Sequence, residues 1–248
     1  MSLTSRLTAP VLFVGDSGEG KSTAIEHLPQ ERTLVINTED KPLPFEEYAS
    51  FKVVRATTYK KLMATLQQLA EIDSVVKGAD GVETIKKGAG SKYDYVVIDS
   101  FTAIAEFIER YVTHMYNGFE QWKQYNLILS EIVNKVKALP QQPFMIALPE
   151  QKDMSFGETK SYVRVKGKEL KYGWVESQFA IVLYTNPIYD EESGEMTDVE
   201  MMFRPNKRNT AKAPQGLFTN RPKNDMLFID KRIQDFYKPK ERATGTAS

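Results

Sequence analysis

The chain has 248 residues, and its 33 basic and 33 acidic side chains give a formal net charge of zero. This length predicts one large domain, and 41% hydrophobic with 27% charged residues indicates a globular protein. The chain has no cysteine, which excludes disulfide scaffolds, thiolate metal sites and thiol nucleophiles. It has only two histidines, His27 and His114, so a metal site built from several histidines is nearly excluded. No apolar run approaches the roughly 18 residues of a membrane span, and the first residues are not typical of a signal peptide. We therefore expect a cytoplasmic protein without membrane contact.

The zero charge is an average over two unlike parts. Residues 204–248 hold eleven Lys and Arg against four Asp and Glu, so this segment is basic and the remainder is acidic. Such asymmetry indicates that the two parts face different partners.

Along the chain, short apolar runs first alternate with helical patterns, and the last two runs are separated only by a turn. The predicted strands lie at residues 10–14, 33–37, 52–55, 93–98, 144–148, 179–184 and 199–203. The predicted helices lie at 59–72, 104–115 and 122–136, and glycines among charges at 75–92 indicate an exposed insertion or hairpin. This order predicts an α/β fold with a mainly parallel sheet and an antiparallel C-terminal edge. We expect one domain over residues 1–237 and a disordered tail at 238–248.

Residues 15–22, GDSGEGKS, match the phosphate-binding pattern G-x-x-x-x-G-K-[ST] between a predicted strand and a helix expected to begin near Lys21. In such a loop successive N–H groups surround phosphate oxygens, and the helix N-terminus favours negative charge. The lysine reaches the β- and γ-phosphates, and the Ser22 hydroxyl is a Mg²⁺ ligand. We therefore predict binding of ATP and Mg²⁺ by Gly15, Asp16, Ser17, Gly18, Glu19, Gly20, Lys21, Ser22 and Thr23.

Acidic and amide side chains follow three other predicted strands. Asp99 ends the strand at 93–98 and is the natural second holder of Mg²⁺. Glu39, or the adjacent Asp40, follows the strand at 33–37 and is placed to orient or deprotonate the attacking water. Gln151, with Glu150, follows the strand at 144–148, where an amide can contact the γ-phosphate.

The order of these parts resembles the RecA-like P-loop ATPases, among them compact phage nucleotide-binding proteins that include single-strand annealing ATPases. The resemblance spans roughly residues 10–210 and is carried by GDSGEGKST at 15–23, LVINTED at 34–40, YVVIDS at 95–100 and FMIALPEQ at 144–151. The segment GKELKYGWVESQFAIVLYT at 167–185 resembles the return from a DNA-binding loop. The resemblance implies Glu39 as catalytic glutamate, and Gln151 or Glu150 as γ-phosphate sensor, although Pro149 blurs that register.

The resemblance also implies DNA-facing loops near residues 111–120 and 152–170, and a finger that contacts a neighbouring subunit's nucleotide. The finger pattern is usually Lys-x-Arg, but Lys207 and Arg208 are adjacent here, which leaves open which one reaches the phosphate. Residues 152–171 combine six Lys or Arg with interleaved aromatic residues, and single-strand binding uses cations for phosphates and aromatic faces for bases. The predicted DNA-binding residues are Lys160, Tyr162, Arg164, Lys166 and Lys168. We predict packing roles for Trp122 and Trp174, which lie on apolar faces.

The sequence thus predicts a Mg²⁺-dependent, DNA-stimulated ATPase. We expect it to bind single-stranded DNA in phage recombination, by annealing or strand pairing. We also expect a homo-oligomer, ring or filament, with nucleotide at the subunit interface. The alternatives are a nucleotide-gated binding or assembly module with slow or no hydrolysis, and a ring-type DNA motor.

Overall fold

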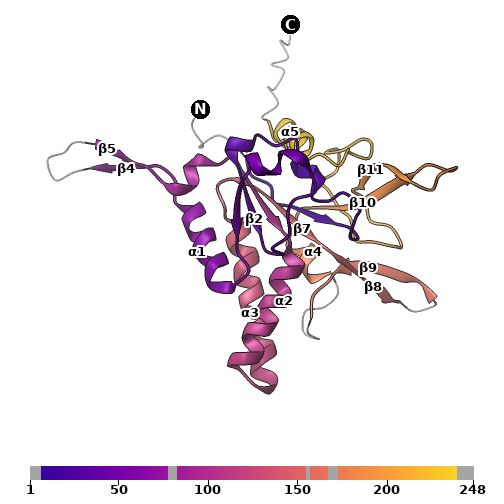
Figure 1. Ribbon diagram of the computed structural model, residues 1–248, viewed down its shortest axis with the longest axis horizontal. Coiled ribbons are helices and arrows are strands. Elements are labelled where there is room, and N and C mark those ends of the chain that lie inside the picture. Colours follow the sequence, from indigo (N-terminus) through magenta and orange to yellow (C-terminus); the bar gives the residue numbers. More distant parts are fainter. Residues whose placement is uncertain (1–6, 78–82, 155–156, 167–172, 239–248) are drawn as a thin grey trace, which may run out of the picture.

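The computed structural model describes residues 7–77, 83–154, 157–166 and 173–238, which are built around a seven-stranded sheet (Figure 1). The strand order is β11-β10-β1-β7-β6-β2-β3. Its strands are β1 (Val11–Val14), β2 (Thr33–Asn37), β3 (Lys52–Arg55), β6 (Tyr95–Asp99), β7 (Gln142–Ala147), β10 (Ile181–Tyr189) and β11 (Met196–Met202). Every pairing is parallel except that of β10 with β11. The predicted mainly parallel sheet with an antiparallel C-terminal edge is therefore confirmed.

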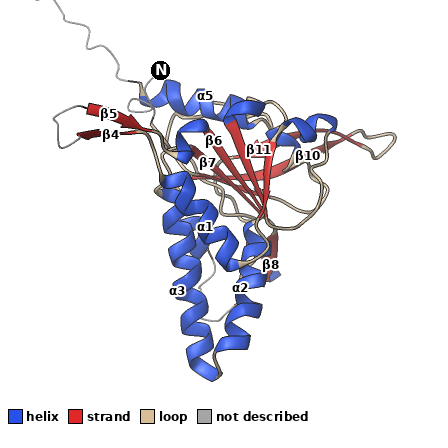
Figure 2. Ribbon diagram, turned by 60° about the vertical axis from the view of Figure 1, so that its left-hand side comes forward, coloured by secondary structure: helices blue, strands red, loops and turns tan. Residues whose placement is uncertain are grey.

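One face of the sheet is covered by three helices, α1 (Tyr59–Ala70), α2 (Phe101–Met115) and α3 (Gly118–Lys137). Side chains alternate across a strand, so Leu12 and Val14 of β1 join this helical layer in one apolar cluster. Figure 2 shows the three helices together on one side of the sheet. Trp122 and Trp174 pack against the same cluster, which confirms the packing role predicted for both.

The opposite face is covered by the short 3-10 helix η2 (Thr23–Ile25) and by α5 (Met226–Tyr237). Val11 and Phe13, the other residues of β1, pack here with Ile25 and Ile229. The sheet is thus the middle of three layers, with α5 on the side away from α1–α3 (Figure 2).

Two small two-stranded sheets lie outside the main one. The hairpin β4 (Ser74–Lys77) and β5 (Glu83–Lys86) projects at the left of Figure 1 and exposes Val75 and Ile85. This confirms the exposed hairpin predicted within residues 75–92. The second hairpin, β8 (Pro149–Asp153) with β9 (Thr159–Val163), follows β7 directly and is succeeded by the short α4 (Trp174–Ser177).

The helix expected from Lys21 is wrong in type and length. The chain after the P-loop forms turns of the 3-10 kind, in which Thr23 N–H donates to the Gly20 carbonyl and Leu28 N–H to that of Ile25. Pro29 follows, and the residue before a proline is disfavoured in the helical region, so a helix that began at Lys21 could not continue past Leu28.

Other 3-10 turns are η3 (Gln30–Arg32), η4 (Glu46–Ser50) and η5 (Ala89–Lys92). Helix α5 was not predicted, and residues 239–248 of the predicted tail lie outside the described residues. Across the described ranges, no helix combines the length and apolar character needed to traverse a bilayer.

Candidate functional site

A cavity of about 880 Å³ lies at the carboxyl ends of β1, β2 and β6. Parallel strands bring their carboxyl ends to one edge, which is why residues distant in sequence meet there. Its lining includes Ser17, Gly18, Gly20, Lys21, Ser22 and Thr23 of the P-loop, together with Asn37, Glu39, Lys41, Asp99 and Ser100. Six of the nine predicted nucleotide-binding residues and two of the predicted carboxylates therefore line one cavity, whereas Gly15, Asp16 and Glu19 are not among its lining residues.

Ser22 and Asp99 meet at the floor of this cavity. The Ser22 hydroxyl donates a hydrogen bond of 2.7 Å to Asp99 Oδ2, although 77 residues separate them in sequence. Burial raises the pKa of Asp99, a shift that the Ser22 hydrogen bond opposes and the nearby Glu39 carboxylate reinforces. A hydroxyl beside a carboxylate offers the oxygen ligands that Mg²⁺ prefers, so these two residues fit the predicted cation. No group of three or more His, Asp or Glu side chains suited to a metal occurs within the described residues.

Lys21 is 7% exposed, and its ammonium donates to the Asp16 carbonyl of the same loop. Burial lowers its pKa, while the carboxylates of Glu19 and Asp99 act in the opposite direction. Lys21 is thus a desolvated cation held within the curl of the P-loop.

The P-loop is fastened to β10 through Glu19. One carboxylate oxygen of Glu19 accepts from the Asp16 N–H at 2.7 Å and also from the Thr185 hydroxyl. A Cβ on Gly15 would lie 1.9 Å from Thr185 Oγ1, so only glycine permits this approach. Gly20 has a φ of 73°, in the left-handed region that favours glycine.

Glu39 faces the cavity from the turn after β2. Its Oε1 accepts from the Ser100 hydroxyl at 2.6 Å, and its Oε2 accepts from the Lys41 ammonium at 3.0 Å. Burial acts to raise the pKa of Glu39, but these two donors outweigh it and the pKa is lowered, so the carboxylate is ionised at neutral pH. Asp40 instead pairs with Arg55 at 2.6 Å and is not among the cavity-lining residues, so the geometry favours Glu39 over Asp40.

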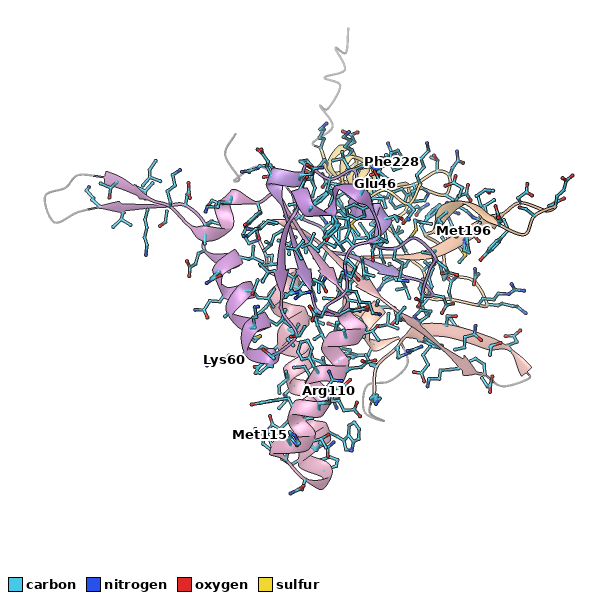
Figure 3. The ribbon with its side chains drawn as sticks, viewed as in Figure 1. Glu46, Lys60, Arg110, Met115, Met196 and Phe228 are labelled. Carbon is cyan, nitrogen blue, oxygen red and sulfur yellow. The ribbon has the colours of Figure 1, made fainter. Side chains whose placement is uncertain are left out.

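The far end of the cavity was missed by sequence reasoning. It is lined by residues 196–199 of β11 and by 223–225, the segment that leads into α5. The Asn224 side chain donates to the Gly20 carbonyl at 2.6 Å, which ties this segment to the P-loop. Met196, the first residue of β11, is labelled in Figure 3. The segment 223–225 reaches the cavity because the chain near residue 222 pairs with β11. No local sequence motif predicts that pairing.

Gln151, Lys207 and Arg208 lie elsewhere. They line a second pocket of about 470 Å³ with Glu158, Thr159 and Ser161 of the β8–β9 hairpin, and none of them lines the P-loop cavity of the same chain. Lys207 forms an ion pair with Glu158 at 2.9 Å. Glu150, the alternative sensor, pairs with Lys152. The structure therefore brings the expected sensor and finger residues together, but apart from the P-loop.

The residues predicted to bind DNA lie in several settings. Tyr162 is 9% exposed, so its ring offers no free face for stacking in this structure, and the Lys160 ammonium lies 5.8 Å from its centroid. Lys166 pairs with Glu109 of α2 at 2.8 Å. Arg164 is exposed, and Lys168 lies outside the described residues.

The other expected DNA loop, residues 111–120, forms the end of α2, the turn and the start of α3. This end of the helical hairpin points downward in Figure 3, where Met115 is labelled. Phe119 is 72% exposed there, and the ten residues include neither lysine nor arginine. Any contact with phosphates at this turn would need cations from other parts of the molecule.

A family described as an AAA domain matches residues 8–214, more than half of the chain. The chain belongs to this family. The matched range of the AAA domain contains the P-loop, Glu39 and Asp99, whereas residues 223–225 at the far end of the cavity lie beyond it. The match establishes an AAA, P-loop NTPase-type domain, in agreement with the fold; it carries no information on a phage or single-strand annealing subtype. No curated protein sequence matches the AAA domain chain.

Proposed function

We propose that this AAA domain hydrolyses ATP in a Mg²⁺-dependent reaction. The observation that carries the proposal is the 2.7 Å contact between Ser22 and Asp99, with Glu39 on the same cavity. Ser22 and Asp99 would hold Mg²⁺, which when bound neutralises charge on the β- and γ-phosphates. The P-loop N–H groups and Lys21 bind the phosphates.

In the proposed reaction, a water oxygen forms a bond to the terminal phosphorus while the bond from that phosphorus to the β–γ bridging oxygen breaks. Glu39 orients the water and accepts its proton, and the products are ADP and inorganic phosphate. The hydrogen bond from Ser100 fixes the direction of the Glu39 carboxylate.

Glu39→Gln tests this assignment, with Asp40→Asn as its matched control. We expect Glu39→Gln to lower turnover by about 10²–10⁴-fold while ATP affinity is retained, because an amide cannot accept the proton. Asp40→Asn should retain turnover, since the Asp40 carboxylate pairs with Arg55 outside the cavity and asparagine tolerates the same left-handed backbone. Wild-type protein that binds ATP without any turnover would instead support a nucleotide-gated binding or assembly module.

We further propose that single-stranded DNA binds along the β8–β9 hairpin, in phage recombination by annealing or strand pairing. What supports this is the continuity of the hairpin with the cavity. Leu148 lines the cavity, the hairpin starts at Pro149, and the Leu148 carbonyl accepts from Arg164 N–H at 2.9 Å. Displacement of Leu148 by nucleotide would therefore be passed to the hairpin.

Fluorescence anisotropy with a labelled single strand tests this part, with ATP, with ADP and without nucleotide. We expect Lys160→Ala/Arg164→Ala to weaken binding and to flatten its salt dependence, because two phosphate contacts are lost. Lys52→Ala/Lys60→Ala removes the same charge from exposed sites elsewhere and should have little effect. Identical binding in all three nucleotide states would contradict the coupling.

The proposed homo-oligomer places Lys207 or Arg208 of one subunit on the nucleotide of the next. The support is that neither residue lines the cavity of its own chain. Lys21→Ala protein mixed with Lys207→Ala/Arg208→Ala protein should recover ATPase activity, since some interfaces then combine an intact P-loop with an intact finger. Mixtures no more active than the sum of their parts, with a monomeric mass in solution, would contradict this.

A further inference from the structure

The turn that carries Glu39 is fixed by one amide side chain. Asn37, buried at the end of β2, accepts from the N–H groups of Glu39 at 3.1 Å and Asp40 at 2.9 Å. The same side chain donates to the Lys41 carbonyl. One residue thus binds three consecutive residues of the turn, which shapes it before any ligand arrives.

The backbone turns sharply at Asp40, between Glu39 and Lys41. The φ of Asp40 is 61°, the sole positive value at a non-glycine position in the described ranges, and its carboxylate is held by Arg55. With Asp40 turned toward Arg55, both flanking side chains, Glu39 and Lys41, line the P-loop cavity. Strained backbone of this kind is found where surrounding structure holds a functional group in place.

Lys41 therefore lines the same cavity as the P-loop. Its ammonium lies 3.0 Å from Glu39 Oε2, and its side chain is 75% exposed. The bond to Glu39, followed by the fields of Glu39 and Asp99, raises the pKa of Lys41, so the side chain is a cation at neutral pH. Of the other lysines in the lining, Lys21 is bound within the P-loop and Lys223 lies at the far end beside Asn224.

Hydrolysis is accelerated when a further cation, beyond the P-loop lysine and the metal, contacts the terminal phosphate. Lys207 and Arg208 do not line this cavity in the same chain, whereas Lys41 is fixed beside the residue that handles the attacking water. We infer that Lys41 is a catalytic residue whose ammonium contacts the terminal phosphate and stabilises the charge that develops there during hydrolysis. This inference rests on the proposed ATPase function.

The binding of ADP with aluminium fluoride, a mimic of the transferring phosphoryl group, tests this role apart from turnover. Calorimetry on the full chain with Mg²⁺ compares ADP alone with ADP plus aluminium fluoride. For Lys41→Met we expect ADP affinity within about 3-fold of wild type but a loss of about 10²-fold in the additional affinity from aluminium fluoride, with a similar fall in kcat. Lys41→Arg should retain most of the additional affinity, because it keeps the charge.

Lys87→Met is the matched control. Lys87 is 79% exposed and pairs with Asp73 at 2.7 Å on the β4–β5 side of the molecule, so it is, like Lys41, an exposed lysine paired with a carboxylate. It should behave as wild type in both titrations.

The outcomes separate the inference from the function beneath it. If wild type gains affinity from aluminium fluoride and Lys41→Met gains the same, the inference is overturned and the ATPase proposal stands. A Lys41→Arg variant as weak as Lys41→Met also overturns it, since charge is what is claimed. If wild type binds no ADP, or gains nothing from aluminium fluoride, both proposals fail.

Discussion

The P-loop cavity and the pocket beside the β8–β9 hairpin are built in different ways. The first collects residues from strand ends of a single sheet, so Ser22, Glu39 and Asp99 meet because their strands are neighbours or near neighbours. The second joins a separate hairpin to the segment around Lys207 and Arg208. The residues proposed for chemistry, which needs fixed distances, are held by the sheet, while those proposed to contact a partner lie on an appended element.

Replacing one residue from each region, Lys21 from the P-loop cavity and Gln151 from the second pocket, should give the largest difference in effect. Lys21→Ala should lower turnover by about 10³-fold, because the desolvated cation of the phosphate site is removed. Gln151→Ala should leave ATP binding by the isolated chain unchanged, since Gln151 lines the other pocket. Steady-state ATPase assays and nucleotide titration measure both, and a collapse of ATP binding in Gln151→Ala would break the comparison.

Asp99→Asn should separate activity from stability at the first site. We expect turnover to fall about 10²-fold. Because the pKa of Asp99 is raised in the folded state, the folded chain binds the proton more tightly than the unfolded chain, and stability declines as pH rises through the interval between the two pKa values. The neutral amide removes that decline, so the variant should be more stable than wild type at pH 7.

Thermal unfolding of Asp99→Asn and wild type at pH 4 and pH 7 checks the sign. The advantage of the variant should be larger at pH 7. If instead the difference in stability, variant minus wild type, is smaller at pH 7 than at pH 4, the ionised carboxylate is stabilising.

At the second region, Glu176 joins the hairpin to the main sheet. Its buried Oε1 accepts from Val163 N–H at 2.9 Å, Tyr184 hydroxyl at 3.1 Å and Thr210 hydroxyl at 3.0 Å. Glu176→Ala leaves three donors without this acceptor and should cost about 3 kcal/mol in the free energy of unfolding. Glu176→Gln keeps an acceptor and should cost less. Urea denaturation measures the loss, and ATP affinity should change little.

The smallest effect is expected where the P-loop is fastened to β10. Thr185→Val removes the hydroxyl that donates to Glu19 and should cost about 1 kcal/mol, seen as a fall of roughly 2–4 °C in Tm. Thr185→Ser keeps the hydroxyl and is the control. A loss in Thr185→Ser with none in Thr185→Val would assign the effect to packing against Gly15 rather than to the hydrogen bond.

Residues fixed by strand position were within reach of the sequence. Asp99 ends one buried strand and Glu39 follows another, Ser22 is specified by the P-loop motif after a third, and parallel strands bring such positions to one edge. The same rule fails for Gln151, because β7 ends at Ala147 and the chain from Pro149 pairs with β9 in a separate sheet.

Helix α5 shows a local signal that was overlooked. Asp225 caps the helix by accepting from Phe228 N–H, and Met226, Ile229 and Ile233 are buried at helical spacing. The contact of Asn224 with Gly20 is different in kind. It joins residues 204 positions apart through the pairing around β11, and no local pattern specifies that pairing.

At the base of the β4–β5 hairpin, hydrogen bonds join the segment before it, residues 71–73, to the segment after it, residues 88–91. Asp73 N–H donates to Ser91 at 2.7 Å, its carboxylate accepts from Gly88 N–H at 3.0 Å, and Gly90 N–H donates to the Glu71 carbonyl at 2.8 Å. The two chain segments are thus tied together before the hairpin leaves the surface. For the protein engineer this makes the hairpin a replaceable part, a place to attach a fluorophore or a purification handle without altering the path of the main sheet.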